Sequence, residues 1–240
     1  PQAQFRLLIQ QYIEFEHLLN ALLAEDLNAF SDRIAQEQRR IQGLQSYIQA
    51  VPTGEMILGD SKASQKLAEQ IDQATATLKP VLFQAQPGTG KTFLAGLIHA
   101  RSRLATQPFA ELDCARLSRS DDGRLNTDAL FGRVGGQAGI LELLERGTLL
   151  LNNVQVLSGG DRARLIHYCQ TGSILPNHGL SGSNTLITEH PKPIQAWVRL
   201  IFASPVKLEL PEVDVITIKL SNLPQRKADI PSFARYFLAQ

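Results

Sequence analysis

The chain has 240 residues, of which 43% are hydrophobic and 20% are charged, so it can bury the core of one large α/β domain with an added segment. Its formal net charge of +1 argues against a strongly basic nucleic-acid-binding surface. No apolar run reaches the length of a membrane span and no signal-peptide pattern opens the chain, so a cytoplasmic location is expected. Cys114 and Cys169 lack metal-site spacing and are expected to be small buried residues in a reducing compartment.

Residues 1–50 differ from the rest because they contain only one proline, Pro1, and one glycine, Gly43. Their apolar residues recur mostly at spacings of three and four, which predicts a helical seam that slips near residues 24–26. A helical hairpin and one long helix with a stutter both fit. The seam can serve a dimerisation or partner-binding coiled coil, or it can fold onto the core of this same chain. Its residues are Phe5, Leu8, Tyr12, Phe15, Leu19 and Leu22, then Leu27, Phe30, Ile34, Ile41, Leu44 and Ile48.

Residues 51–55 are predicted to be a linker, because Val-Pro-Thr-Gly interrupts the helical pattern. Residues 56–240 alternate between apolar runs and helical patterns, which favours a parallel sheet flanked by helices. Strands are expected at 81–83, 108–114, 147–153, 198–203 and 213–220, and helices at 61–78, 93–100, 140–144, 161–170 and 230–238. Residues 171–197, rich in Gly, Ser, Asn and Pro, indicate a long loop or an irregular hairpin.

The strand at 81–83 leads into Ala-Gln-Pro-Gly-Thr-Gly-Lys-Thr at residues 85–92, which matches the phosphate-binding pattern G-x-x-x-x-G-K-[ST] except for Ala85 at the first position. The glycines let backbone N–H groups converge on a phosphate, and the following helix adds its dipole. The lysine reaches the terminal phosphates, and the threonine hydroxyl can bind the Mg²⁺ of a nucleotide. The pattern predicts a site for ATP or ADP with Mg²⁺, formed by Gln86, Pro87, Gly88, Thr89, Gly90, Lys91 and Thr92.

Six blocks in a fixed order then resemble the AAA+ domain of bacterial sigma-54-dependent transcription activators. They are the phosphate-binding loop, PFAELDC, LFG, GTLLLNN, VRLIFAS and LPQRKADIPSFARYFL, and together they cover roughly residues 56–240. In that family the second and fourth blocks are approximately PFVAVNCAAL and GTLFLDEI. The resemblance implies an AAA+ P-loop NTPase fold with a RecA-like parallel sheet. It also implies ATP bound between the subunits of a ring, and a GAFTGA loop that remodels sigma-54 RNA polymerase.

The chain departs from this family where the chemistry is concentrated. The family's Asp-Glu pair, which orients Mg²⁺ and polarises the attacking water, aligns with Asn152 and Asn153. An asparagine carries no charge and no useful basicity, so no catalytic residue is expected at either position. At the sensor position the family's Thr-Asn aligns with Ser204 and Pro205, so only a serine hydroxyl remains to face the γ-phosphate.

Three further segments depart from the family. After Leu-Phe-Gly at 130–132, residues 133–139 run directly into Ile140, so the GAFTGA element is missing. The segment that carries the family's trans-acting arginines is absent, and residues 208–213 contain no arginine. The chain stops at Gln240, early in what would become the lid, so the lid is expected to be mostly absent, and no DNA-binding element is seen.

Together these features favour a regulatory module that binds ATP or ADP, hydrolyses it poorly or not at all, and does not remodel sigma-54 polymerase: a pseudo-ATPase in a transcription regulator. One alternative is a protein-interaction module that has also lost nucleotide binding. A second alternative is an active ATPase remodeller, which would need a carboxylate from elsewhere, such as Asp121, Asp122 or Glu142. Self-association or partner binding is expected through residues 1–50.

Overall fold

The computed structural model describes residues 27–51, 61–119, 123–134, 136–177, 192–222, 227–232 and 234. It divides the chain into two units, Pro1–Gln45 and Ser46–Gln240. In the first unit, residues 27–45 form a continuous helix on which Leu27, Phe30, Ile34 and Ile41 are exposed. The choice between a hairpin and a stutter falls on residues outside the described ranges, as do most of the expected linker and of the helix at 230–238. No helix within the described ranges is both long and apolar enough to span a bilayer.

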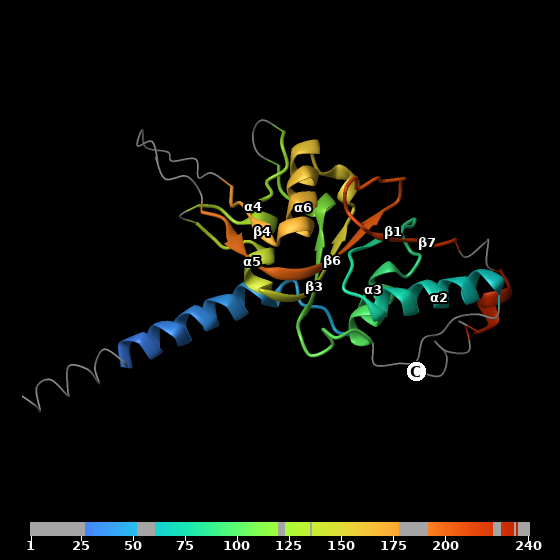
Figure 1. Ribbon diagram of the computed structural model, residues 1–240, viewed down its shortest axis with the longest axis horizontal. Coiled ribbons are helices and arrows are strands. Elements are labelled where there is room, and N and C mark those ends of the chain that lie inside the picture. Colours follow the sequence, from blue (N-terminus) through green and yellow to red (C-terminus); the bar gives the residue numbers. More distant parts are fainter. Residues whose placement is uncertain are drawn as a thin grey trace, which may run out of the picture. The chain divides into compact units, whose positions relative to one another are not determined.

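The second unit is built on a five-stranded parallel sheet in the order β2-β3-β6-β1-β7 (Figure 1). Its central strands have fully buried apolar runs, as expected for strands covered on both faces. The expected α/β fold with a parallel sheet is therefore confirmed. The strands are β1 (Val81–Gln84), β2 (Phe109–Asp113), β3 (Arg146–Asn152), β6 (Trp197–Ser204) and β7 (Ile216–Lys219).

Helices cover both faces of this sheet. On one face, Ile71 of α2 (Lys62–Ala76) and Leu97 of α3 (Lys91–Ala100) belong to the same buried cluster as Phe83 of β1. Neighbouring strand residues point the other way, and the fully buried Leu82 and Phe202 show that the second face is covered too. Each such side chain contributes roughly 1.5–3 kcal/mol by its burial. The helices of the second face are α4 (Asp128–Phe131), α5 (Ile140–Leu144) and α6 (Gly159–Thr171) (Figure 1).

Residues 47–49 pair antiparallel with β2, the outermost strand on its side of the sheet. The Gln49 N–H donates to the Phe109 carbonyl at 2.9 Å, and the Glu111 N–H donates to the Tyr47 carbonyl at 2.9 Å. The helical seam predicted helix as far as Ile48, whereas the helix ends at residue 45. The difference has a physical reason: the open ladder groups of β2 satisfy the backbone of this segment in an extended conformation.

The long segment at 171–197 is an irregular hairpin at its base. Strands β4 (Ser173–Ile174) and β5 (Ile194–Gln195) pair antiparallel, while residues 178–191 lie outside the described part. The buried Tyr168 hydroxyl of α6 holds this base against the sheet, because it accepts from the Val198 N–H at 2.8 Å and donates to the Ala196 carbonyl at 3.0 Å.

The last block of the chain is tied to the start of α2. The Asp229 carboxylate is fully buried and accepts from the Ser61 N–H at 3.0 Å, the Ser61 hydroxyl at 2.8 Å and the Ser64 hydroxyl at 2.7 Å. Ser61 also caps α2 by accepting from the Ser64 N–H. This brings residues 61–64 and 229 together although they lie far apart in sequence. Short 3₁₀ turns complete the unit at η1 (Cys114–Arg116) and η2 (Val154–Val156).

Candidate functional site

The phosphate-binding loop lies between the end of β1 and the first residue of α3. Gly88 and Gly90 adopt φ angles of 77° and 84°, in the left-handed region that favours glycine. A Cβ built at either position would meet nothing within 4 Å, so the backbone conformation, not crowding, calls for glycine. The loop is anchored to the end of β6: the Ala85 N–H donates to the Ser204 carbonyl at 2.9 Å, and Gln86 Nε2 donates to the Pro205 carbonyl at 3.1 Å.

The start of α3 offers donors to an anion. No side chain caps this helix at Gly90, so its first N–H groups face the loop. Lys91 Nζ donates to the Gln86 carbonyl at 3.0 Å, and Thr89 Oγ1 donates to the same oxygen at 2.8 Å. Burial lowers the pKa of the Lys91 ammonium, while the negative charges of Glu111 and Asp113 act in the opposite direction. The arrangement fits a phosphate group.

A carboxylate from β2 lies directly beside the loop. Thr92 Oγ1 donates to Glu111 Oε1 at 3.3 Å, and Asn152 Nδ2 donates to that same oxygen. A carboxylate only accepts, so the amide nitrogen of Asn152 must face it. Asn152 Oδ1 is buried and has no hydrogen-bond partner among the residues that the structure describes.

A second carboxylate on β2 holds the second asparagine. Asp113 Oδ1 accepts from Asn153 Nδ2 at 2.8 Å and from the Ala115 N–H at 3.0 Å, while Arg116 Nε lies 3.6 Å from Asp113 Oδ2. Asp113 and Asn152 are paired in the register between β2 and β3. Asn153 has a φ of 57°, a left-handed conformation that asparagine tolerates better than most residues. Both asparagine amides therefore donate to acidic residues of the neighbouring strand.

Sequence reasoning missed Glu111 and Asp113 and considered other carboxylates. Asp121 and Asp122 lie outside the described residues, and Glu142 lies in α5, where burial raises its pKa. The missed signal was two acidic residues at alternate positions of a strand, which place both side chains on one face.

The sensor serine is engaged in a local turn. The Ser204 side chain is fully buried, and its hydroxyl donates to the Val206 carbonyl at 2.8 Å and accepts from the Val206 N–H at 3.2 Å. Its proton is thus used within the chain at the end of β6, and its backbone carbonyl anchors the phosphate-binding loop.

A tight turn occupies the place where the family has its remodelling loop. Arg133 N–H donates to the Gln137 carbonyl at 3.2 Å, and Gly136 N–H donates to the Arg133 carbonyl at 3.0 Å. The two ends of the turn touch, since a Cβ on Gly139 would lie 2.2 Å from the Gly132 nitrogen. Only glycine fits at this position.

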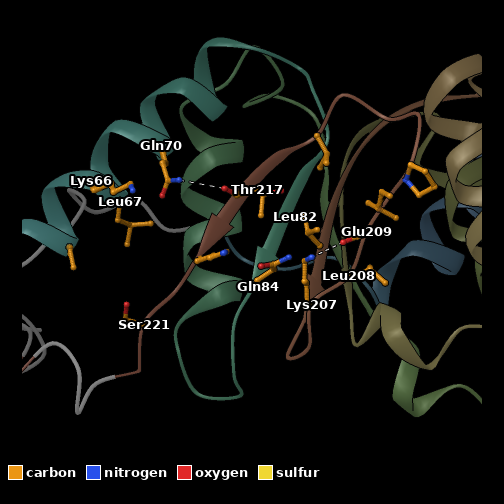
Figure 2. A pocket seen from close by; sticks show the side chains of 15 residues that line it. Lys66, Leu67, Gln70, Leu82, Gln84, Lys207, Leu208, Glu209, Thr217 and Ser221 are labelled. Carbon is orange, nitrogen blue, oxygen red and sulfur yellow. Dashed lines mark hydrogen bonds and ion pairs between the residues drawn. The ribbon is translucent and has the colours of Figure 1, made fainter.

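A cavity of about 770 Å³ lies apart from the loop, between α2, β1, β7 and residues 207–211 (Figure 2). Lys66, Lys207 and Lys219 contribute to its wall, and Lys207 Nζ pairs with Glu209 Oε1 at 2.6 Å. None of its lining residues belongs to residues 85–92. It is therefore a separate feature from the phosphate-binding loop.

The residues beside the loop fit the Mg²⁺ of a nucleotide. Mg²⁺ prefers oxygen ligands and is usually held by one or two side chains together with phosphate oxygens. Thr92, Glu111 and Asn152 offer a hydroxyl, a carboxylate and an amide oxygen that no described residue hydrogen-bonds, so every donor is a hard oxygen. Within the described ranges no group of three or more His, Cys, Asp or Glu side chains is placed to hold a metal by itself.

Comparison with known proteins agrees with this fold. The model of the sigma-54 interaction domain matches residues 57–210. A Nif-specific regulatory protein of Rhizobium etli is 31% identical over 201 residues, which cover 76% of this chain and 32% of that protein. Another, from Rhizobium leguminosarum bv. trifolii, is 32% identical over 208 residues, covering 78% of this chain and 55% of that protein. The crystal structure of NtrX from Brucella abortus in complex with ATP superposes with a TM-score of 0.58 at 22% identity, over 90% of this chain and 49% of that one.

The parallel sheet and the glycine-rich loop at the start of α3 define a P-loop NTPase domain of the AAA+ class. Within that class, the chain belongs to the family of sigma-54 interaction domains, the AAA+ domains of sigma-54-dependent activators. It spans 32% of the length of the Rhizobium etli relative.

Proposed function

We propose that this chain is a nucleotide-binding regulatory domain of a transcription regulator, which holds ATP or ADP with Mg²⁺ at residues 86–92. The observation that carries the proposal is the formed loop: left-handed Gly88 and Gly90, Lys91 directed at the loop carbonyl, and an uncapped helix start. The ATP and ADP complexes of Brucella abortus NtrX, which shares the fold, support the choice of ligand.

We further propose that hydrolysis is slow. Two neutral amides, Asn152 and Asn153, stand where the family has its acidic pair, and losing a general base typically lowers a rate by about 10² to 10⁴. Residues 208–213 also supply no arginine to stabilise charge on a transferred phosphoryl group. Without appreciable turnover, the nucleotide leaves the site only by dissociation and so acts as a regulatory ligand.

Calorimetry with ATP and ADP, combined with a phosphate-release assay, tests both statements. Binding of either nucleotide that Lys91→Ala removes, with little phosphate release, is the expected result. A lack of ATP and ADP binding at millimolar concentration overturns the binding proposal and favours the interaction-module alternative. Turnover above about 1 s⁻¹, the lower end of ordinary enzyme rates, overturns the slow-hydrolysis proposal if Lys91→Ala abolishes it and Asn153→Ala does not.

The tight turn between Gly132 and Gly139 supports a proposal about partners: this domain does not remodel sigma-54 polymerase in the family's usual way. Within the described residues 132–134 and 136–139, the two ends of this segment are held against each other, which brings its described backbone back on itself. An in vitro assay of open-complex formation with sigma-54 polymerase and ATP is expected to show no product. Open complexes formed by this chain, at the level given by an activator that carries GAFTGA, would contradict the proposal.

The helix at residues 27–45 supports a proposal of self-association. Leu27, Phe30, Ile34 and Ile41 are between 44% and 67% exposed although they form one apolar seam. In the full chain, Phe30→Glu together with Ile34→Glu is expected to lower the mass measured by light scattering, whereas exposed Gln36→Glu is not. A single mass for all three proteins, equal to that of one chain, would rule out self-association and leave a different partner for the seam.

A further inference from the structure

The acidic residue beside Thr92 comes from a strand to which the family pattern assigns no such role. We propose that Glu111 of β2 supplies the negative charge on the metal side of the Mg–nucleotide site, replacing the carboxylate that Asn152 of β3 cannot provide. This inference rests on the proposed nucleotide binding. It assigns Glu111 as a positioning residue that acts on Mg²⁺ through the Thr92 hydroxyl.

The hydrogen bond between Thr92 and Glu111 leaves the Thr92 hydroxyl able to bind a cation. A hydroxyl has one proton to donate and two lone pairs. The Thr92 proton goes to Glu111 Oε1 at 3.3 Å, so the lone pairs of the hydroxyl stay available to a cation. Residues that hold a metal ligand in this way fix its orientation and add to its basicity, and their loss typically costs about 10- to 100-fold in metal affinity.

The acidic residues at this edge of the sheet stand on a different strand from those of the family pattern. The family blocks place Ala and Asn at the positions of Glu111 and Asp113, and Asp and Glu at the positions of Asn152 and Asn153. In this chain the two carboxylates stand on β2 instead of β3, and each asparagine amide at the end of β3 donates to a β2 carboxylate. The number of carboxylates at this corner is therefore the same as in the family pattern. An unselected loss of the acidic pair has no reason to be matched by two gains on the adjacent strand.

Of the two carboxylates, Glu111 is the one placed for the metal. Asp113 Oδ1 already accepts from Asn153 and from the Ala115 N–H, and Arg116 lies beside Oδ2. Glu111, in contrast, contacts Thr92, the first residue after the lysine of the loop. Asn152 Nδ2 contacts the same Glu111 oxygen, so Asn152 orients the carboxylate that replaces its family counterpart.

The experiment measures the affinity of the full chain for ATP by calorimetry, once with Mg²⁺ and once with EDTA. Wild type is expected to bind ATP more tightly with Mg²⁺. Glu111→Gln is expected to weaken Mg–ATP binding by about tenfold or more while changing binding in EDTA by less than about twofold. Glu111→Asp, which keeps the charge on a shorter side chain, is expected to recover part of the Mg²⁺ effect and serves if the Gln variant does not fold. The matched control is Glu142→Gln, a partly buried glutamate on α5 that is expected to behave as wild type.

Each remaining outcome decides against the proposal in a distinct way. Equal weakening by Glu111→Gln with Mg²⁺ and with EDTA would make Glu111 a structural residue only. Loss of the Mg²⁺ effect in Asp113→Asn but not in Glu111→Gln would move the role to Asp113. Wild-type binding that does not respond to Mg²⁺ would overturn the inference and the Mg²⁺ part of the proposed function, and would leave nucleotide binding at residues 86–92 standing. No ATP binding under either condition would remove both.

Discussion

The phosphate-binding loop and the two strand ends beside it lie at the same edge of the sheet, but they relate differently to the family pattern. The loop keeps the glycines, the lysine and the threonine in their usual order, because each contributes a backbone conformation or an atom at one fixed place. The ends of β2 and β3 instead differ from the pattern in charge, because the carboxylates Glu111 and Asp113 lie on β2 and the neutral Asn152 and Asn153 stand at the end of β3. Backbone geometry restricts a position more tightly than charge does.

Of the loop and the strand ends, the loop is where a single substitution should have the largest effect on ATP affinity. Lys91→Ala removes charge-assisted hydrogen bonds worth about 1.5–3 kcal/mol, so ATP affinity should fall by roughly 10- to 150-fold. Calorimetry measures the ATP affinity. The control is Lys62→Ala, which removes an exposed lysine at the start of α2. Unchanged affinity in Lys91→Ala would show that nucleotide is held elsewhere.

The turn at residues 132–139 has a family counterpart of different length, and its own geometry should be as demanding as that of the loop. A Cβ on Gly139 would lie 2.2 Å from the Gly132 nitrogen and 2.6 Å from the Leu130 carbonyl oxygen, so Gly139→Ala is expected to destabilise the fold by roughly 3 kcal/mol. Gly159→Ala is the control, because a Cβ there meets nothing within 4 Å. Urea unfolding at equal m-values gives the comparison. Equal midpoints for both variants would show that this turn is open in solution.

The strand ends can be returned to the family pattern one residue at a time. Asn152→Asp sets a second carboxylate against Glu111 Oε1 and should cost about 1.5–3 kcal/mol of stability at pH 8. Sharing the site raises the folded-state pKa of one carboxyl above its unfolded value, so the penalty shrinks at pH 5. Adding Glu111→Ala should relieve it, with a coupling of about 1 kcal/mol or more in urea unfolding. Additive effects would show that the two residues do not share a site.

The smallest expected effect is the pH dependence of stability that comes from His99, and it is present in every variant compared at two pH values. His99 is fully buried and stacks on Phe109, its Nδ1 lies 2.9 Å from Thr148 Oγ1, and burial, with the nearby Arg199 charge, lowers its pKa below 6.5. The unfolded chain then binds the proton more readily. This part of the stability is complete above pH 6.5 and is lost as pH falls, by at most about 1.4 kcal/mol per unit. Urea unfolding of His99→Gln and of wild type at pH 7.5 and 5.5 measures this contribution of His99 to the free energy of unfolding. The same pH dependence in both proteins would show that it comes from other groups.

The sequence predicted the elements of the sheet well because their signal is local. The apolar run in β3 and the strand, loop and helix around Lys91 each follow from a few neighbouring residues. The contact between Glu111 and Thr92 depends on the register of β2 against β3 and on the placement of α3, neither of which a single strand pattern contains. The Ser204 hydroxyl was expected to face the γ-phosphate. Its hydroxyl instead bonds to the backbone of Val206, because a serine in a turn readily forms hydrogen bonds with the backbone of the second residue after it.

The segment at residues 47–49 has a consequence for solubility. An outer strand such as β2 presents a row of backbone donors and acceptors on which another chain can add, and this is a common start of aggregation. Here the Tyr47 carbonyl and the Gln49 N–H occupy those groups along β2. A shortened chain that begins at residue 51, where the helical pattern breaks, would expose this edge, whereas one that begins at residue 46 keeps the cover.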